Sequence, residues 1–361
     1  MENGSKRELL SLDVCELEEW MLSVGEPKYR AKQLFGQLHK GCSPDDMTNL
    51  GKQLKQTLRD AFVWHLPVAE RKLVSAIDGT VKYLFSLKDG NCVESVVMRY
   101  EHGNTICISS QVGCRMGCKF CASTIGGRIR DLTPGELLGQ VISAQKDLGE
   151  RISNIVMMGI GEPLDNYANV LKFLRLVNCE EGINIGYRHI SLSTCGIVDK
   201  IRLLMEEDLP ITLSISLHAP DDETRSAIMP INKRFGVDAL LDACRAYFAK
   251  TGRRISFEYT LIAGKNDSPE NAEKLAKVLN AKLRSRTETM PIHVNLIPVN
   301  EVSETGFRRS SAKAVNAFAK VLESRGIRAT VRRKLGADIN ASCGQLRRES
   351  VAEKENEADG H

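Results

Sequence analysis

Three cysteines in the segment GCRMGCKFC are the residues best suited to chemistry in this sequence. Cys114, Cys118 and Cys121 follow the spacing Cys-x3-Cys-x2-Cys, so their thiols can act together as metal ligands or redox partners. Structural zinc generally takes four Cys or His ligands in paired short spacings, and no second Cys-x2-Cys or His-x3-His pair follows. A thioredoxin-like site would use Cys118 and Cys121 alone and would leave Cys114 without a role.

The spacing of the three thiols favours an iron–sulfur cluster. A [4Fe–4S] cluster held by three thiolates keeps one iron open for a small chelating ligand. The amine and carboxylate of S-adenosylmethionine would fill that position, and electron transfer into its sulfonium group would release a carbon radical. Radical chemistry at these cysteines follows if the ligand of the open iron is S-adenosylmethionine.

Strand-like and helical segments alternate after about residue 104, and this alternation must position the cysteines. The predicted strands are TICISS, SNIVMMG, RHISLSTC, ITLSISLH, RISFEYTLI, PIHVNLIPV and RATVRRK. The predicted helices are TPGELLGQVISAQKDLG, NYANVLKFLRLVN, IVDKIRLLMEED, VDALLDACRAYFAKTG and SPENAEKLAKVLNAKL. Such alternation predicts an α/β fold with parallel strands, built as a full or partial β/α barrel. The cysteine motif directly follows the first strand, at the strand ends where such barrels carry active sites.

The chain divides into five predicted parts. Residues 1–75 have helical periodicity and form a small N-terminal helical domain, and residues 76–99 form a β-rich connector. The barrel spans residues 100–337, and residues 338–348 carry a late cysteine, Cys343. Residues 349–361 contain five acidic residues and one lysine, which predicts a disordered acidic tail.

Composition predicts a globular protein of the cytoplasm. Of the 361 residues, 42% are hydrophobic and 27% are charged, and no apolar run is long enough to span a bilayer. The N-terminus lacks the hydrophobic stretch of a signal peptide, so we expect the eleven cysteines to stay reduced. The first 348 residues carry a net charge of +8 and the tail −4, which is compatible with a polyanionic partner.

Polar residues end several of the predicted strands, where they are poor core material and good ligand contacts. The segment GIGEP offers two glycines that permit a tight turn, followed by the carboxylate of Glu162. The other candidates are Ser193, Ser216, Leu217, His218 and, in mid-strand, Asn295. From the residues alone, GIGEP can also be an ordinary turn, and His218 can be a hydrogen-bonded structural histidine.

Seven motifs in order resemble the RlmN/Cfr branch of the radical S-adenosylmethionine superfamily, a family of RNA adenine methyltransferases. They are SSQVGCRMGCKFCAST, GIGEPLDNY, RHISLSTCGI, SISLHAP, MPIN, HVNLIPVN and ASCGQLR. The resemblance runs from the N-terminal helices to about residue 348 and implies a partial barrel with a [4Fe–4S] cluster on Cys114, Cys118 and Cys121. It also implies S-adenosylmethionine contacts at Gly161, Glu162, Ser193, Ser216, Leu217, His218 and Asn295. Position 195 departs from the pattern, because many relatives have Ser where this chain has Cys.

The resemblance assigns the remaining chemistry to three residues. Cys343 is methylated by a first S-adenosylmethionine, and a 5′-deoxyadenosyl radical from a second removes a hydrogen from the methyl group, whose carbon then adds to adenine. Glu94 matches the proton acceptor, with Glu101 as a nearby competitor, and Cys107 matches the cysteine that forms a transient disulfide with Cys343. From the residues alone, Cys107 is more typical of core packing, whereas the cations beside Cys343 favour a thiolate.

The implied partners are RNA and a reductant. The resemblance implies methylation of adenine C2 in 23S rRNA and in tRNA, with flavodoxin or ferredoxin as electron donor and a monomeric enzyme. We expect phosphate contacts from three basic stretches: Lys28, Arg30 and Lys32 in the N-terminal RNA-binding domain, RGIRATVRRK, and INKRF. No aromatic stacking platform is evident in the sequence.

Three alternatives remain open at this stage. A Cfr-type enzyme would methylate C8 of the same ribosomal adenine with the same cluster, glutamate and cysteines. A zinc-stabilised RNA-binding protein would use the three cysteines for structure alone. Another radical enzyme would act on small molecules or peptides.

Overall fold

A single curved sheet forms the centre of the protein. The computed structural model describes residues 6–284, 290–301, 305–341 and 346–347. Within these residues the main sheet has ten strands in the order β14-β13-β12-β11-β10-β9-β6-β5-β4-β3. The spatial order of these ten strands is the same as their order along the chain, so each strand pairs with the strand of this sheet that precedes it in the sequence. A doubly wound sheet would instead reverse its order at a switch point.

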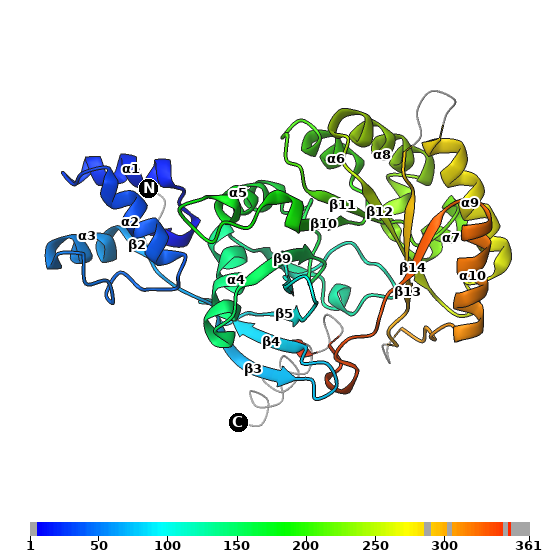
Figure 1. The fold of residues 1–361 in the computed structure, drawn as a ribbon, viewed down its shortest axis with the longest axis horizontal. Helices are drawn as coiled ribbons and strands as arrows, with labels where there is room; N and C mark the ends of the chain where they lie inside the picture. Colours follow the sequence, from blue (N-terminus) through cyan, green and yellow to red (C-terminus); the bar gives the residue numbers. More distant parts are fainter. Residues whose placement is uncertain (1–5, 285–289, 302–304, 342–345, 348–361) are drawn as a thin grey trace.

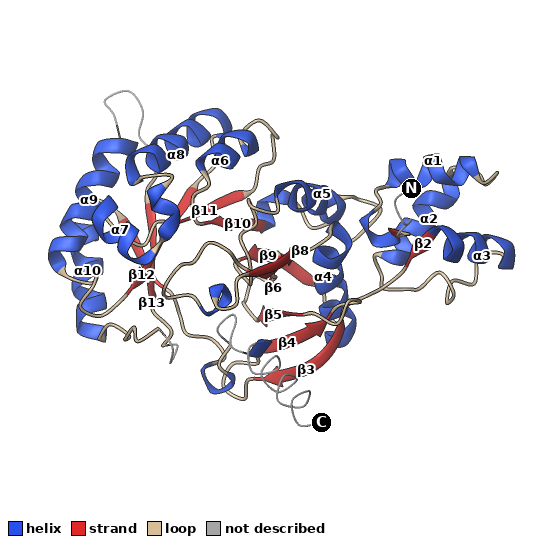
Figure 2. Ribbon diagram, turned by 180° about the vertical axis from the view of Figure 1, so that it is seen from behind, coloured by secondary structure: helices blue, strands red, loops and turns tan. Residues whose placement is uncertain are grey.

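The strands from β6 onward pair in parallel and carry helices on their outer side (Figures 1 and 2). The strands are β6 (Asn104–Cys107), β9 (Ile152–Met157), β10 (Ile190–Thr194), β11 (Thr212–Ser216), β12 (Ile255–Leu261), β13 (His293–Pro298) and β14 (Arg328–Val331). The helices are α4 (Pro134–Leu148), α5 (Tyr167–Asn178), α6 (Val198–Leu204), α7 (Asp222–Ile228), α8 (Val237–Thr251), α9 (Pro269–Leu283) and α10 (Ala312–Ser324). The predicted partial β/α barrel is confirmed.

Local sequence explains where the barrel helices begin and end. Helix α4 starts with a capping box between Thr133 and Glu136, has Pro134 in its first turn, and stops at Gly149 in the left-handed conformation. Helix α9 likewise begins after a capping serine, Ser268. The inner faces of these helices are apolar, and their buried residues pack in the main hydrophobic core.

An antiparallel meander extends the sheet on the β6 side. It consists of β3 (Val68–Val74), β4 (Val81–Ser86) and β5 (Cys92–Met98). One face carries Tyr83, Phe85, Val93 and Val97 and belongs to the main core. Because side chains alternate along a strand, the opposite face carries Lys82, Leu84, Cys92, Glu94 and Val96. The meander starts at Val68, earlier than the predicted boundary at residue 76.

The N-terminal module forms a separate lobe at the left of Figure 1. It contains α1 (Val14–Ser23), α2 (Tyr29–Leu38), α3 (Lys52–Ala61) and a parallel pair of short strands, β1 (Arg7–Glu8) and β2 (Phe62–Val63). Leu17, Met21, Leu34, Phe35 and Leu58 are among its buried residues. The predicted helical character is confirmed. The two short strands pair the first residues of the module with its last residues.

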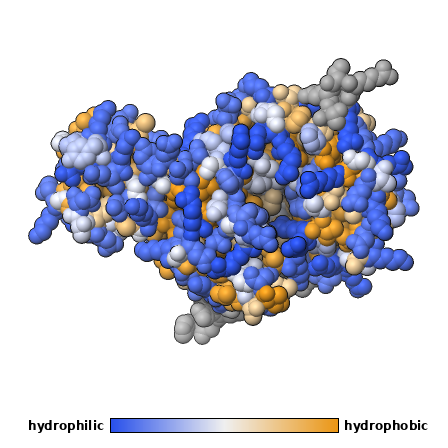
Figure 3. Space-filling model, viewed as in Figure 1, coloured by the Kyte–Doolittle hydropathy of each residue, from blue (hydrophilic) through white to orange (hydrophobic). Residues whose placement is uncertain are grey.

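Hydrophilic side chains dominate the face of the molecule in Figure 3, with hydrophobic side chains in small groups between them. In the described part of the chain, no helix combines the length and the apolar character of a membrane span. The predicted tail, residues 349–361, lies outside the described residues.

Candidate active site

The three motif cysteines lie in the loop of a small hairpin above the barrel. Strands β7 (Gln111–Gly113) and β8 (Arg128–Asp131) pair antiparallel, and the cysteines lie between them. Cys114 and Cys118 are 6% and 9% exposed, and Cys121 is half-buried. The loop follows β6 directly, so it lies at the C-terminal ends of the parallel strands.

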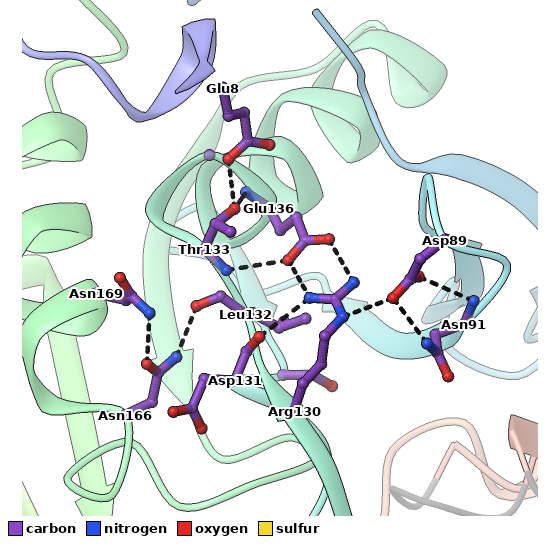
Figure 4. A network of polar contacts seen from close by, with 12 residues as sticks. Glu8, Asp89, Asn91, Arg130, Asp131, Leu132, Thr133, Glu136, Asn166 and Asn169 are labelled. Atoms are coloured by element: carbon purple, nitrogen blue, oxygen red, sulfur yellow. Dashed lines mark hydrogen bonds and ion pairs between the residues drawn. The ribbon is translucent and has the colours of Figure 1, made fainter. Parts of the chain in front are cut away.

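A network of ion pairs and hydrogen bonds attaches this hairpin to the barrel (Figure 4). Arg130 of β8 makes two bonds to Glu136 of α4, at 2.7 and 2.8 Å, and its Nε donates to Asp89 at 2.6 Å. Such a bidentate pair has defined geometry. Glu8 of the N-terminal module also lies at the N-terminus of α4, where its carboxylate accepts a hydrogen bond from Thr133. The start of α4 therefore holds both the hairpin that carries the cysteine loop and the N-terminal lobe.

The cysteines line a cavity of about 210 Å³ at the C-terminal strand ends, here called the cysteine cavity. Its other lining residues come from the ends of β9 to β13 and include Gly161, Glu162, Ser193, Ser216, His218 and Glu258. The barrel therefore brings five of the sequence-predicted residues, from three different segments, around the three thiols.

The thiols are poorly solvated in this cavity. Burial, together with the nearby Glu162 carboxylate and the Cys121 thiol, raises the pKa of Cys114 to about 12. Burial also raises the pKa of Cys118. Thiolates here need a positively charged partner, which metal ions supply.

The donor set fits a cluster better than a single metal ion. Among the described residues, no three Cys, His, Asp or Glu side chains converge as ligands of one ion. The three thiolates of a [4Fe–4S] cluster bind three separate irons, so they do not need to converge on one point. Three sulfur donors around one cavity, with a polar wall opposite, are suited to such a cluster.

The glycines of GIGEP are required by the packing of the chain on itself. A Cβ at Gly159 would lie 2.5 Å from the carbonyl oxygen of Ile108. Gly161 has φ +106°, and a Cβ there would lie 2.7 Å from Gln111 N. The prediction that these glycines allow a ligand to approach closely is therefore incomplete. Their lack of a side chain also allows this loop to pack against residues 108–111, which lead into the cysteine motif.

Glu162 connects two of the loops at the cavity. Its Oε2 accepts from the backbone N–H of Cys195 at 2.7 Å, and its Oε1 accepts from that of Leu164 at 3.0 Å. Burial raises the pKa of this carboxyl group, and the two N–H donors oppose that shift. Cys195, the departure from the family pattern, therefore lies beside Glu162 in the cavity wall.

His218 lies in the cavity wall in a fixed, neutral form. Its backbone has φ +57°, Nδ1 accepts from the N–H of Thr260 at 2.9 Å, and its ring meets Phe120 edge-on at 5.0 Å. Burial lowers its pKa to about 3. Leu217, by contrast, is fully buried in the main core, and its carbonyl accepts from Arg225.

Asn295 lies away from the cysteine cavity. Its Nδ2 donates to Glu258 Oε2 at 2.6 Å, and it lines a second cavity deeper in the barrel. The tertiary structure thus separates Asn295 from the five predicted contacts that line the cysteine cavity, although Glu258 lines both cavities.

Sequence reasoning missed Arg225, a fully buried arginine on α7. Its Nη2 donates to the carbonyl of Cys195 at 2.7 Å, and its Nη1 donates to Asn232 at 2.9 Å. With its bond to Leu217, Arg225 holds the ends of β10 and β11 at the cavity. The only signal in the sequence was its place beside the MPIN motif.

Cys107 lies at a third cavity, of about 250 Å³, here called the side cavity, and Glu94 lies on the same face of the sheet. Cys107 is 4% exposed and lines the side cavity, together with Phe120, Cys121 and Ala341. Glu94 is 1% exposed and forms an ion pair of 3.2 Å with the equally buried Lys82. Val96, two residues from Glu94, pairs with Cys107, so both predicted groups share one face of the sheet. Glu101 lies in an exposed turn beyond β5.

Cys343 lies outside the described residues, but the chain on both sides of it is held at this face. Lys82 Nζ donates to the carbonyl of Asn340 at 3.0 Å. Glu94 Oε1 accepts from the N–H of Arg347 at 2.7 Å. The Lys82–Glu94 pair therefore binds both flanks of residues 342–345. Lys82 was missed because a lysine in an alternating strand normally faces water.

A partial β/α barrel with three cysteines after its first parallel strand defines a radical S-adenosylmethionine enzyme. Residues 108–276 match the family model of the Radical SAM superfamily, and residues 7–63 match that of the ribosomal RNA large subunit methyltransferase N-terminal domain. The chain belongs to the RlmN family of radical S-adenosylmethionine RNA methyltransferases.

The relatives support this assignment over nearly the whole chain. The chain is 51% identical over 347 residues to a Clostridium novyi protein named "Probable dual-specificity RNA methyltransferase RlmN", covering 96% of this chain and 99% of that protein. It is 53% identical to a Clostridium tetani protein of the same name, over 95% and 96% of the two chains. A crystal structure of a radical SAM methyltransferase from Sphaerobacter thermophilus superposes with a TM-score of 0.87 at 42% identity, covering 94% and 98%. These findings argue against the zinc-stabilised RNA-binding alternative.

Proposed function

We propose that this protein methylates C2 of adenine in 23S rRNA and in tRNA, through a methyl group carried on Cys343. One observation carries the proposal most: Cys107, the buried Glu94 carboxylate and the flanks of the Cys343 segment gather on one face of the sheet, beside a cavity that Cys107, Cys121 and Ala341 line. The names of the relatives support RNA as substrate. The choice of C2 and of both RNAs rests on the resemblance of the motifs.

The cysteine cavity is the proposed place of the cofactors. Cys114, Cys118 and Cys121 would hold a [4Fe–4S] cluster, and Gly161, Glu162, Ser193, Ser216 and His218 would contact S-adenosylmethionine. When bound, this pair supplies a carbon radical that removes a hydrogen atom from methylated Cys343. Phe120, Cys121 and Met158 line both this cavity and the side cavity, so the proposed cofactor site would adjoin the cavity that Cys107 and Ala341 line. We exclude Leu217 from side-chain contact because it is buried in the core.

Glu94 is the proposed proton acceptor. After the Cys343 carbon adds to the adenine, a proton leaves the ring carbon, and the Glu94 carboxylate accepts it. Lys82 Nζ lies 3.2 Å from that carboxylate and holds it in place beside the Cys343 segment. The site is 1% exposed, so water competes poorly for the proton.

Cys107 is the proposed resolving thiol. Its thiolate would attack the Cys343 sulfur and form a disulfide, while the bond between that sulfur and the transferred carbon breaks. The carbon would keep the bonding electron pair and take up a proton, which completes the methyl group on the base. Ala341, two residues before Cys343, packs in the same small apolar cluster as Cys107. This contact supports the proposal, because Ala341 is the last described residue before the Cys343 segment.

The remaining partners follow the family resemblance. We propose flavodoxin or ferredoxin as electron donor, a monomeric enzyme, and action in the cytoplasm. A Cfr-type enzyme that methylates C8 is the second candidate, because it would use the same cluster, Glu94, Cys107 and Cys343.

The test compares two cysteine variants made with their RNA. Protein reconstituted with iron and sulfide under anaerobic conditions, with reductant and S-adenosylmethionine, should yield 2-methyladenosine in rRNA and tRNA by mass spectrometry. Cys107→Ala should accumulate a covalent protein–RNA adduct, whereas Cys343→Ala should form none. Methylation at C8 would establish the second candidate, and unmodified adenine in both RNAs would reject the proposal.

A further inference from the structure

A second cavity opens at the opposite end of the barrel from the motif cysteines. It has a volume of about 520 Å³ and is here called the lower cavity. Arg188, Thr212 and Arg254, which line it, lie at the N-terminal ends of β10, β11 and β12. The cysteines lie at the C-terminal ends, so the lower cavity approaches the centre of the barrel from the other side.

Unpaired positive charge surrounds the lower cavity. Arg188, Arg254, Arg332 and Arg333 line it, and in the described part of the chain none of these four side chains forms an ion pair or hydrogen bond. By contrast, Arg99, Arg130 and Arg175 each contact a carboxylate within 3.0 Å. Arginines that gather around a cavity without carboxylate partners are suited to bind an anion from outside.

The single carboxylate in the lining already accepts hydrogen bonds from neighbouring side chains. Glu258 accepts from Ser256 Oγ at 3.0 Å and from Asn295 Nδ2 at 2.6 Å. Asn154 adds a donor, because its buried Nδ2 has no hydrogen-bond partner among the described residues, while its Oδ1 contacts His189 at 3.0 Å. The cavity thus has polar donors in excess of acceptors.

Two aromatic rings flank the same cavity. Tyr100 and His102 line it and stack on each other with centroids 5.1 Å apart and an interplanar angle of 13°. Tyr100 is 40% exposed. The sequence showed no aromatic platform, because these rings follow β5 in a short turn and gain their arginine neighbours only in the folded barrel. Arginines beside an exposed ring are the usual combination for single-stranded nucleic acid.

The lower cavity also leads to the proposed reaction centre. Met98, Tyr100, Met158 and Arg332 line both it and the side cavity that contains Cys107. A base that enters past Tyr100 would therefore meet the face of the sheet that carries Glu94. A neighbouring phosphate would remain at the arginines.

We propose that the lower cavity is a binding site for single-stranded RNA. Arg188 and Arg254, with Arg332 and Arg333, bind the phosphates beside the target adenine, and Tyr100 stacked on His102 receives a flanking base. The identity of this RNA as substrate rests on the proposed function. Arg332 and Arg333 belong to a basic stretch predicted from the sequence, whereas Arg188, Arg254, Tyr100 and His102 are new.

The test measures RNA affinity of the reconstituted holoenzyme against salt. The probe is a short, fluorescently labelled single-stranded RNA with the anticodon-loop sequence, and binding is followed by anisotropy. The double variant Arg188→Gln/Arg254→Gln should bind about tenfold more weakly, and its slope of log affinity against log salt should fall by about 1.4, about 0.7 per lost phosphate contact. Tyr100→Ala should lose about tenfold with an unchanged slope, and Tyr100→Phe should restore binding.

The matched control is the double variant Arg202→Gln/Arg245→Gln on α6 and α8, two exposed arginines away from all three cavities, which removes the same two charges. If the double variant binds within twofold of this control with the same slope, the site is wrong. In the methylation assay the double variant should raise KM and leave kcat at saturating RNA unchanged. If wild-type protein leaves adenine unmodified while the double variant still loses RNA affinity and salt slope, the proposed function fails and the RNA site stands.

Discussion

Lys82 Nζ lies 3.2 Å from Oε2 of Glu94, and each side chain is 1% exposed. The two residues come from neighbouring antiparallel strands, and both also bind the backbone on either side of the Cys343 segment. A charged pair buried this fully is costly to break by removing one partner. The pair therefore links the stability of the meander to the position of the residues that flank the Cys343 segment.

Replacing Lys82 should destabilise the protein strongly. Lys82→Met leaves the Glu94 carboxylate buried without its cation, so the free energy of unfolding should fall by about 3–5 kcal/mol. The double variant Lys82→Met/Glu94→Gln should recover part of this loss, because it removes the uncompensated charge. Urea unfolding of the wild type, Lys82→Met, Glu94→Gln and the double variant gives the coupling energy between the two side chains. Additive effects of the two substitutions would show that the pair is not coupled.

Glu94→Gln should separate the steps of the proposed reaction. The amide keeps the shape of the side chain and its acceptor for the Arg347 N–H, but it cannot take a proton. We expect methylation of Cys343 to persist and RNA methylation to fall about 10²- to 10⁴-fold, measured by mass spectrometry of the protein and of nucleosides. Glu101→Gln, in the exposed turn, is the matched control, and an equal loss there would argue against Glu94 as the base.

Removing one motif thiol should remove the cluster and leave the fold. Cys118→Ala deletes a sulfur donor, so the reconstituted protein should lose its visible iron–sulfur absorption and most of its bound iron. Since the substitution removes only a small buried side chain, circular dichroism should stay close to that of the wild type. Cys244→Ala, another buried cysteine on α8, should keep the absorption. Iron retained by the Cys118 variant would contradict the assignment.

His39 should make the N-terminal module sensitive to acid. Burial lowers its pKa to about 3 from the ordinary value of 6.5. Below pH 6.5 the unfolded chain therefore binds a proton that the folded chain excludes until about pH 3, and stability falls as pH decreases through this window. The contribution is about 1.4 kcal/mol per pH unit. His39→Gln should flatten the dependence of unfolding free energy on pH between these values, and an unchanged slope would show that His39 is not responsible.

The sequence was sufficient for the features that depend on local spacing. The alternation of strands and helices predicts the barrel because each segment carries its own periodicity, capping residues and turns. The cysteine spacing likewise predicts the cluster loop, since ligands only a few residues apart remain close in any fold. Gly161, Glu162, Ser193, Ser216 and His218 were found because strand ends converge in a parallel barrel.

Only the tertiary structure decided which distant groups meet. Asn295 belongs to the lower cavity because its side chain leaves β13 at mid-strand beside Glu258. The sequence does not show how far along the barrel axis such a side chain lies. Gly159 is required by contact with Ile108, some fifty residues earlier in the chain. The Lys82–Glu94 pair, the arginines of the lower cavity and the stacked Tyr100 depend on strand register and barrel closure. Burial, ion pairing and cavity shape arise from the packing of remote segments, which local sequence does not encode.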